Sequence, residues 1–131
     1  MWNLPLTLSG RSLAVAMPKP ERGEIWQVDW SPGRGSEQTG RRPALIVQTD
    51  PANHNPRYPN TIVVTISTKG RNVPSHVRVE PTAENGLAPP SFIKCEQLLT
   101  ISKERLEKRL GRLSAGDIEH VATALRVVLE L

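Results

Sequence analysis

Residues 61–68 read TIVVTIST, and every residue in this stretch except Ser67 is β-branched. β-Branched side chains pack well on a pleated surface, so the stretch predicts a β-strand. The apolar run ALIVQT at residues 44–49 predicts a buried strand before it. Further back, EIWQVDW at residues 24–30 alternates apolar and polar residues in part and predicts a third strand.

The rest of the chain adds shorter strands and one helix. Residues 76–80 and 92–95 predict two more strands, and residues 98–112 a short strand or a turn of helix. Near the C-terminus, Ser114 and Asp117 form a capping-box-like start, and apolar residues then follow at helical spacing. Short strands closed by one terminal helix predict a mainly β fold, a small curled barrel with a C-terminal α-helix.

Two segments predict loops. Residues 31–42 hold three glycines and a proline, and residues 50–60 are rich in proline and asparagine. A chain of 131 residues predicts a single domain. We assign this domain to residues 21–131 and interpret residues 1–20 as an N-terminal extension, either disordered or preceding a true start at Met17.

The basic residues are concentrated in the middle of the chain. The sequence pI is about 9.7. Residues 34–78 hold seven basic side chains against two acidic ones, a net charge of +5, while the whole chain carries only +4. Such a concentration attracts phosphate and so favours a nucleic-acid partner. A solvated basic face is an equally good interpretation of the charge alone.

The cysteine count, the spacing of acidic residues and the length of the apolar runs argue against disulfide-rich, metal-binding and membrane-spanning proteins. Cys95 is the single cysteine, which excludes an internal disulfide and predicts a buried, inert thiol in a reducing, cytoplasmic setting. The acidic residues are scattered without ligand spacing, so we expect no metal and no cofactor. No apolar run approaches the ~20 residues needed to span a bilayer.

Two further groups are interpreted as structural. Trp26 and Trp30 share a strand face and are predicted to contact the core or a dimer partner rather than stack on bases. The charged stretch at residues 103–112 is predicted to be a solvated face with salt bridges, not a track for RNA.

Four stretches together resemble the MazF/PemK toxins in order and spacing. They are RGEIWQVDWSP from Arg22, GSEQTGRRPALIVQTD from Gly35, NTIVVTIST from Asn60, and CEQLLTISKERL from Cys95. The resemblance runs from about Arg22 to the C-terminus. It implies a Src-homology-3-like barrel of the CcdB/MazF type, usually a homodimer. It also implies sequence-specific cleavage of single-stranded mRNA without a metal, by the toxin of a toxin–antitoxin pair.

The resemblance also implies site residues. By position, the catalytic arginine of the family falls on Arg42, and its hydroxyl partner falls on Ser67, where relatives usually have threonine. Thr68 also carries a hydroxyl, but neighbours in a strand point to opposite faces, so only one of the two can serve. The residues expected to contact RNA are Ser36, Glu37, Gln38, Arg41, Thr68, Lys69, Arg71 and Gln97.

Cleavage without a metal uses the 2′-hydroxyl of the substrate as nucleophile and leaves a 2′,3′-cyclic phosphate. The planar fork of Arg42 can hold two phosphate oxygens as negative charge develops on them. The general base stays open, because arginine hardly ever loses its proton. Candidates are His76, His54 and Glu37, although a lone histidine is more often structural than catalytic.

A ribonuclease of this kind implies an antitoxin. The glycine-rich loop before Arg42 should be mobile when the protein is free, and the groove around Arg41, Lys69 and Arg71 should be positive. An antitoxin with an acidic, flexible C-terminal segment could occupy this groove as an RNA mimic. Two alternatives remain: a non-catalytic toxin that binds a protein such as a gyrase, and an RNA-binding barrel that does not cleave.

Overall fold

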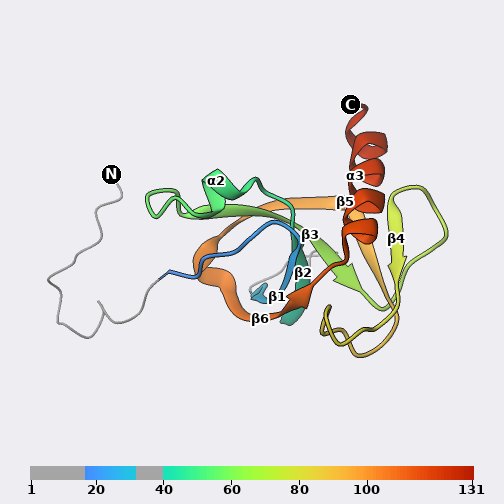
Figure 1. Ribbon diagram of the computed structural model, residues 1–131, viewed down its shortest axis with the longest axis horizontal. Coiled ribbons are helices and arrows are strands. Elements are labelled where there is room, and N and C mark those ends of the chain that lie inside the picture. The colour runs from blue at the N-terminus through green and yellow to red at the C-terminus, as the bar shows by residue number, and fades with distance from the viewer. Residues whose placement is uncertain (1–16, 32–39) are drawn as a thin grey trace, which may run out of the picture.

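A computed structural model describes residues 17–31 and 40–131. The predictions about residues 1–16 and about most of the loop at 31–42 therefore lie outside the described residues. The helices and strands follow the chain in this order (Figure 1): β1 Glu24–Asp29, β2 Arg41–Ile46, α2 Asp50–Asn53, β3 Asn60–Ser67, β4 His76–Val79, β5 Ser91–Ser102, the 3-10 turn η1 Lys103–Arg105, β6 Leu106–Arg112, and α3 Ala115–Leu129.

The six strands form one antiparallel sheet in the order β4-β5-β3-β2-β1-β6. The chain passes from β5 through η1 into β6, which pairs with β1. β5 and β6 follow each other in the chain but are separated by three strands in the sheet, which curls to bring them together (Figure 1). The predicted mainly β, curled fold with a terminal helix is confirmed. Within the described residues the edge strands β4 and β6 do not pair, so the barrel stays open.

The prediction was wrong about the length of β5. A strand was expected at residues 92–95 and a short element at 98–112, but β5 runs continuously for 12 residues. The cause is a bulge against β3: Val64 is opposite Leu98, whereas the next residue, Thr65, is opposite Lys94. Residues 95–97 therefore have no partner in the ladder, and the interruption of the alternation hides the continuity of the strand.

The expected loop at residues 50–60 also contains a short helix, α2. Proline in its first turn fits a helix start, because the missing N–H would have no partner there. Asn53 is buried beneath the helix, where its side chain accepts hydrogen bonds from Gln48 and Thr61. These buried contacts with residues on either side of the helix stabilise an element that the local composition did not indicate.

The face of the sheet toward α3 holds the larger apolar cluster. Ile25, Leu45, Val64, Ile66 and Ile93 are all essentially inaccessible to solvent, and they pack with residues of α3. The helix begins as predicted, since the Ser114 hydroxyl accepts a hydrogen bond from the backbone N–H of Asp117 at 3.1 Å.

Cys95 lies in this cluster and is buried, as predicted. Burial, with a smaller contribution from the charge of Glu96, raises the pKa of its thiol to about 11. At neutral pH the side chain is therefore a protonated, apolar group of the core.

The second apolar cluster fills the inside of the curl. Val28, Ala44, Ile46 and Val63 pack there with Trp30, which is 8% exposed. The prediction that Trp30 is a core residue is confirmed. This cluster covers the second face of β1, β2 and part of β3, but it does not extend to β4.

Candidate active site

Arg42 and Ser67 belong to the same face of the sheet. In the pairing of β2 with β3, Ala44 is opposite Thr65 and Leu45 is opposite Val64. Continuing this register by two residues puts Arg42 opposite Ser67. Because side chains alternate along a strand, Arg42, Thr65 and Ser67 all point to the side away from α3. The side chain of Arg42 is exposed there.

Arg41 points to the other side of β2. Its guanidinium forms an ion pair with Glu107 of β6, with 2.9 Å between Nε and Oε1. The register agrees, since Arg41 is opposite Asp29 while Arg42 is opposite Val28 of the inner cluster. Of these two neighbouring arginines, only Arg42 faces the same side as Ser67.

The hydroxyl of Ser67 can donate a hydrogen bond. Its Oγ accepts a hydrogen bond from the backbone N–H of Lys69 at 3.1 Å, which leaves the hydroxyl proton available. Thr65, two residues earlier, is buried and donates its hydroxyl proton to the Gln97 side chain. Thr68 lies in the bend that follows β3 and is exposed.

The turn from β3 to β4 frames an open, basic pocket of about 510 Å³. The turn can pack this closely against β5 only because residue 70 is glycine, since a Cβ at Gly70 would overlap the side chain of Phe92. The residues lining the pocket are Lys69, Gly70, Arg71, Val73, Ser75, His76, Lys94 and Glu96. Three cationic side chains against one carboxylate give this pocket a positive field.

His76 fixes this turn. Its Nδ1 accepts a hydrogen bond from the backbone N–H of Arg71 at 3.0 Å, so the ring proton belongs to Nε2 in the neutral form. Nε2 lies 3.0 Å from Oε2 of Glu96, to which it donates. Both ring nitrogens are engaged, and the side chain is only 9% exposed. In this arrangement neither nitrogen is free to accept a further proton.

Glu96 is held in its ionised form. Burial acts to raise the pKa of its carboxyl, but hydrogen bonds, first of all from His76, outweigh burial and hold the pKa below its usual value. The pocket therefore presents a fixed carboxylate beside the cations of Lys69, Arg71 and Lys94.

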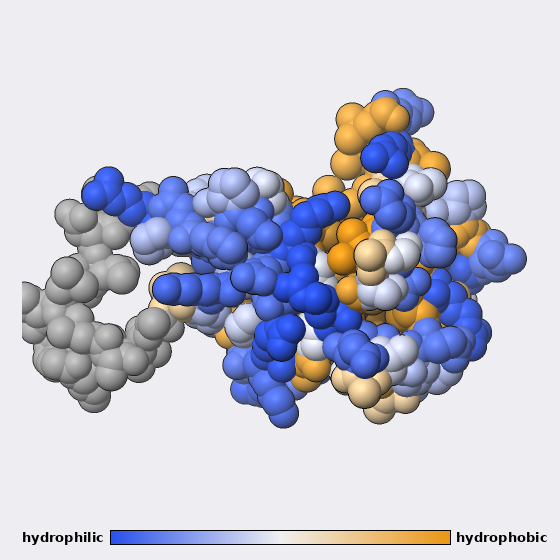
Figure 2. Space-filling view, viewed as in Figure 1, coloured by the Kyte–Doolittle hydropathy of each residue, from blue (hydrophilic) through white to orange (hydrophobic). Residues whose placement is uncertain are grey.

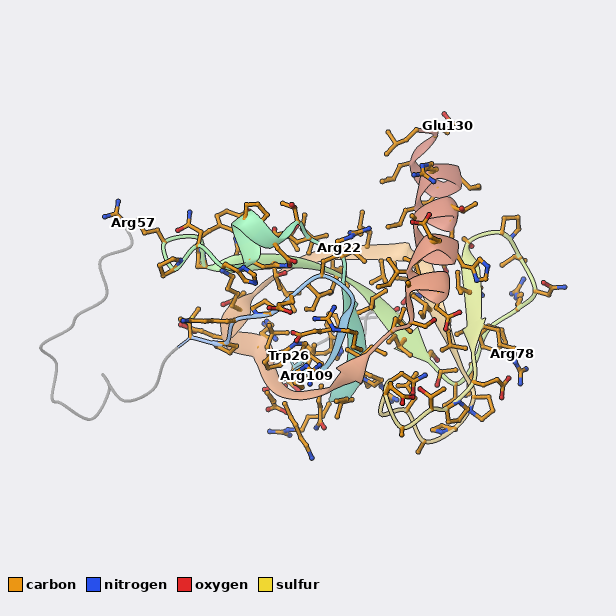
Figure 3. The ribbon with its side chains drawn as sticks, in the orientation of Figure 1. Arg22, Trp26, Arg57, Arg78, Arg109 and Glu130 are labelled. Carbon is orange, nitrogen blue, oxygen red and sulfur yellow. The ribbon has the colours of Figure 1, made fainter. Side chains whose placement is uncertain are left out.

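The basic residues of the middle of the chain do not form one patch. Arg57 lies on the loop after α2 and Arg78 on β4, and the two are at opposite ends of the molecule (Figure 3). His54 ends α2 and pairs with Glu21 at 3.6 Å. The structure brings Arg42, Ser67, Lys69, Arg71, His76 and Gln97 to the open face but leaves His54 and Arg57 elsewhere.

The remaining predictions concern three RNA-binding residues, metal binding and membrane spans. Ser36, Glu37 and Gln38 lie outside the described residues. Within residues 17–31 and 40–131, no three His, Cys, Asp or Glu side chains gather as a metal-binding group. Of the described helices, none is long and apolar enough to cross a membrane.

Two charged residues of the pocket, Lys94 and Glu96, were not predicted from the sequence. Lys94 is opposite both Thr65 on β3 and His76 on β4, so it lies on the same face as Ser67. Glu96 projects from the bulge of β5 and contacts His76. The alternation within residues 92–95 could have marked Lys94 as polar and outward-facing, but the register that brings it beside Ser67 joins distant parts of the chain.

Similarity to known proteins identifies the family of this chain. A family model described as "PemK-like, MazF-like toxin of type II toxin-antitoxin system" matches residues 21–129. The chain is 37% identical over 114 residues to Endoribonuclease MazF9 of Mycobacterium tuberculosis, covering 84% of this chain and 96% of that protein. It is 38% identical over 113 residues to Endoribonuclease MazF of Staphylococcus epidermidis, covering 84% and 91%.

Among solved structures, the fold is similar to that of the Mycobacterium tuberculosis toxin MazF-mt6. The TM-score is 0.68 and the sequence identity 27%, and the match covers 82% of this chain and 97% of that one.

Proposed function

Because this chain belongs to the PemK-like, MazF-like toxin family of type II toxin–antitoxin systems, we propose that it is an endoribonuclease that cleaves single-stranded mRNA. Relatives that are 37% and 38% identical to it over 114 and 113 residues carry the name endoribonuclease. The observation that supports the proposal most directly is the pairing of Ala44 with Thr65, because the same register extended by two residues would set Arg42 against Ser67.

Arg42 and Ser67 would act on the scissile phosphate. The 2′-hydroxyl gives up its proton to a base and attacks the adjacent phosphorus. The P–O bond to the 5′-oxygen breaks, this oxygen takes a proton from solvent and leaves as a 5′-hydroxyl, and a 2′,3′-cyclic phosphate remains. The guanidinium of Arg42 binds the phosphoryl oxygens as their charge increases. One such fixed donor lowers the activation barrier by ~3–4 kcal/mol. Ser67 adds a hydrogen bond from its hydroxyl, whose proton is available.

The basic pocket would bind the RNA next to the cleavage point. Lys69, Arg71 and Lys94 line a hollow on the same side of the sheet as Ser67, and phosphate binds to such a concentration of cations. Unstacked bases of single-stranded RNA can present their edges to polar groups. Gln97 is a proposed RNA contact on this face, and Thr68 is a proposed contact in the bend that follows β3. Ser36, Glu37, Gln38 and Arg41 are proposed from the resemblance alone.

The general base is proposed to be His76 or Glu37. His76 lies in the pocket, but it can accept the 2′-hydroxyl proton only after one of its hydrogen bonds, to Arg71 or to Glu96, opens. Replacing His76 with glutamine distinguishes the two candidates. Loss of the acidic limb of the pH–rate profile, where the rate falls as a general base becomes protonated, would assign the base to His76.

The family description supports an antitoxin partner. We propose that this partner inserts an acidic, flexible C-terminal segment into the basic pocket, because the pocket carries three cations against one carboxylate. We further propose a homodimer in the cytoplasm, where mRNA is available. Apolar atoms gather at the C-terminal end of α3 (Figure 2), where Val127, Leu129 and Leu131 are exposed. Exposed apolar side chains that gather in this way favour association.

The experiment is cleavage of a labelled single-stranded RNA library by the pure protein, with the cut ends mapped. We expect cutting at a defined sequence, in the presence of a strong chelator, with cyclic phosphate ends. A substrate lacking the 2′-hydroxyl at the cut site should remain intact. Binding of RNA without cutting would instead indicate a non-cleaving RNA-binding barrel. Neither binding nor cutting of RNA would favour a protein target such as a gyrase.

The antitoxin proposal is tested by competition. If the acidic segment occupies the groove, RNA and antitoxin exclude each other, and Arg42→Glu weakens the binding of both. Simultaneous binding of the two, with unchanged affinities, would contradict the proposal and put the inhibitory contact elsewhere.

A further inference from the structure

Arg105 binds the backbone at the end of β1. Its guanidinium nitrogen Nη1 donates hydrogen bonds to the carbonyl oxygens of Asp29 and Ser31, each at 2.8 Å. These carbonyls flank Trp30, at the point where the chain leaves the sheet. Hydrogen bonds from a charged donor are about twice as strong as those between neutral groups, so this contact holds the segment firmly.

The residue between the two carbonyls in turn holds Arg42. The backbone N–H of Trp30 donates to the carbonyl of Gly40 at 2.8 Å. Its indole Nε1 donates to the carbonyl of Arg42 at 3.3 Å, while the ring is buried in the inner cluster. A continuous set of contacts thus runs from the guanidinium of Arg105 to the main chain of Arg42.

The element that carries Arg105 is itself anchored. Lys103, in the same 3-10 turn, is 3% exposed, so the prediction that residues 103–112 are a solvated face is wrong at this position. Its ammonium donates to the carbonyls of Ala52 and Asn55 at 3.2 and 3.1 Å, at the end of α2. Salt bridges do occur further along, since Arg109 pairs with Glu24 at 2.8 Å.

We propose that Arg105 is a positioning residue for Arg42. It fixes the end of β1 against η1, and Trp30 transmits this position to the first residues of β2. The inference rests on the proposed ribonuclease activity, in which Arg42 must meet the phosphate in one geometry. A misplacement of about 1 Å at a reacting group can reduce a rate on the order of 100-fold.

The test compares Arg105→Met with Arg126→Met, which removes the same charge from the exposed surface of α3. We expect Arg105→Met to lower kcat by about 10- to 100-fold with little change in KM, because substrate binding does not need the exact position of Arg42. Arg126→Met should cleave like the parent. Arg105→Lys, which keeps a charged nitrogen with several donors, should recover part of kcat.

A phosphorothioate substrate separates positioning from general damage. Sulfur at a non-bridging oxygen of the scissile phosphate weakens its hydrogen bond with Arg42, so the parent should cut this substrate more slowly. In Arg105→Met the contact is already displaced, and the sulfur effect should shrink. A kcat within twofold of the parent, or a lower kcat with an unchanged sulfur effect, would overturn the proposal. Should Arg105→Met not fold, Arg105→Gln serves in its place.

Failure of the inference and failure of the proposed function can be told apart. If the parent protein cuts no RNA, the proposed function is wrong, and the contacts are then measured without activity. The indole N–H of Trp30 should exchange with solvent faster in Arg105→Met than in Arg126→Met. Equal exchange rates would overturn the proposed role of Arg105 whatever the activity of the protein.

Discussion

The two faces of β3 carry different kinds of residue. Toward α3, Val64 and Ile66 are excluded from solvent and pack in the larger apolar cluster. On the opposite side, Thr65 binds Gln97 and Ser67 faces the open groove. Alternate residues of one strand thus serve the core and the site, so substitutions at neighbouring positions should affect different properties of the protein.

The largest effect is expected at Arg42, on the open face. Arg42→Ala should abolish measurable cleavage, a loss of about 10²–10³-fold or more, because the charge developing on the phosphoryl oxygens loses its fixed donor. Arg42→Lys should also be poor, since a point charge cannot reproduce the two-pronged contact. Cleavage rates and thermal unfolding of the purified variants provide the measurement.

Arg41→Ala is the matched control for Arg42→Ala. Its guanidinium is on the other side of β2 and pairs with Glu107, so its loss should reduce cleavage far less. A lysine variant of Arg42 that cuts at the parental rate would contradict the proposed role of this arginine.

The second prediction concerns the covered face. Ile66→Ala should lower the free energy of unfolding by about 2–5 kcal/mol, because the side chain is 1% exposed and its removal leaves a cavity. The cleavage rate per folded molecule should change little. Urea unfolding and active-site titration measure the two properties. A specific loss of turnover in a fully folded Ile66→Ala protein would show that the two faces are not independent.

The third prediction compares two neighbouring hydroxyls. Ser67→Ala should reduce cleavage by roughly tenfold or more, as expected for the loss of a hydrogen bond of ~1.5 kcal/mol in the transition state. Thr68→Ala should have a smaller effect, because Thr68 lies in the bend beyond the strand. Single-turnover rates measure both. An equal or larger loss at Thr68 would mean that the register across β2 and β3 differs from the one described.

The smallest effect is expected from Glu96. Because its pKa is lower in the folded protein than in the unfolded chain, ionised Glu96 stabilises the fold at neutral pH. This contribution is complete above the ordinary glutamate pKa of about 4.3 and is lost as the pH falls through the folded pKa. The side chain is 41% exposed, so solvent screening limits the contribution to about 1 kcal/mol at most.

Urea unfolding of the parent and of Glu96→Gln measures this contribution. The difference in unfolding free energy between the two proteins should be present near neutral pH and disappear as the pH falls through the lowered pKa of Glu96 in the folded protein. A difference that is constant across this range would assign the effect to packing rather than to charge.

Local signals in the sequence predicted most of the fold. β-Branched content identified β3, the serine cap and apolar spacing identified α3, and alternation identified β1. They failed where contacts between distant residues decide the structure. The bulge in β5 disguised a long strand, and α2 depends on buried side-chain hydrogen bonds to β3 and the residues before the helix.

The candidate site could be predicted only in part for the same reason. The family resemblance led to Arg42 and Ser67, and the argument that only one of two neighbouring hydroxyls can face the site favoured Ser67. No local pattern connects Lys94 or Glu96 with them, because these residues meet across β3, β4 and β5. The buried position of Lys103 was missed because a lysine among charged residues is usually solvated.

The bulge between Lys94 and Leu98 also bears on how this protein can diverge from its relatives. Residues 95–97 have no partners in the β3 ladder, yet Glu96 and Gln97 point to the groove. Replacing either of these two side chains disturbs no pairing with β3. Cys95, the first unpaired residue, is instead confined because its side chain is buried in the core. Substitutions at these two positions would therefore change the lining of the groove without shifting the strand register, at the cost of the hydrogen bonds that Glu96 makes with His76 and Gln97 makes with Thr65.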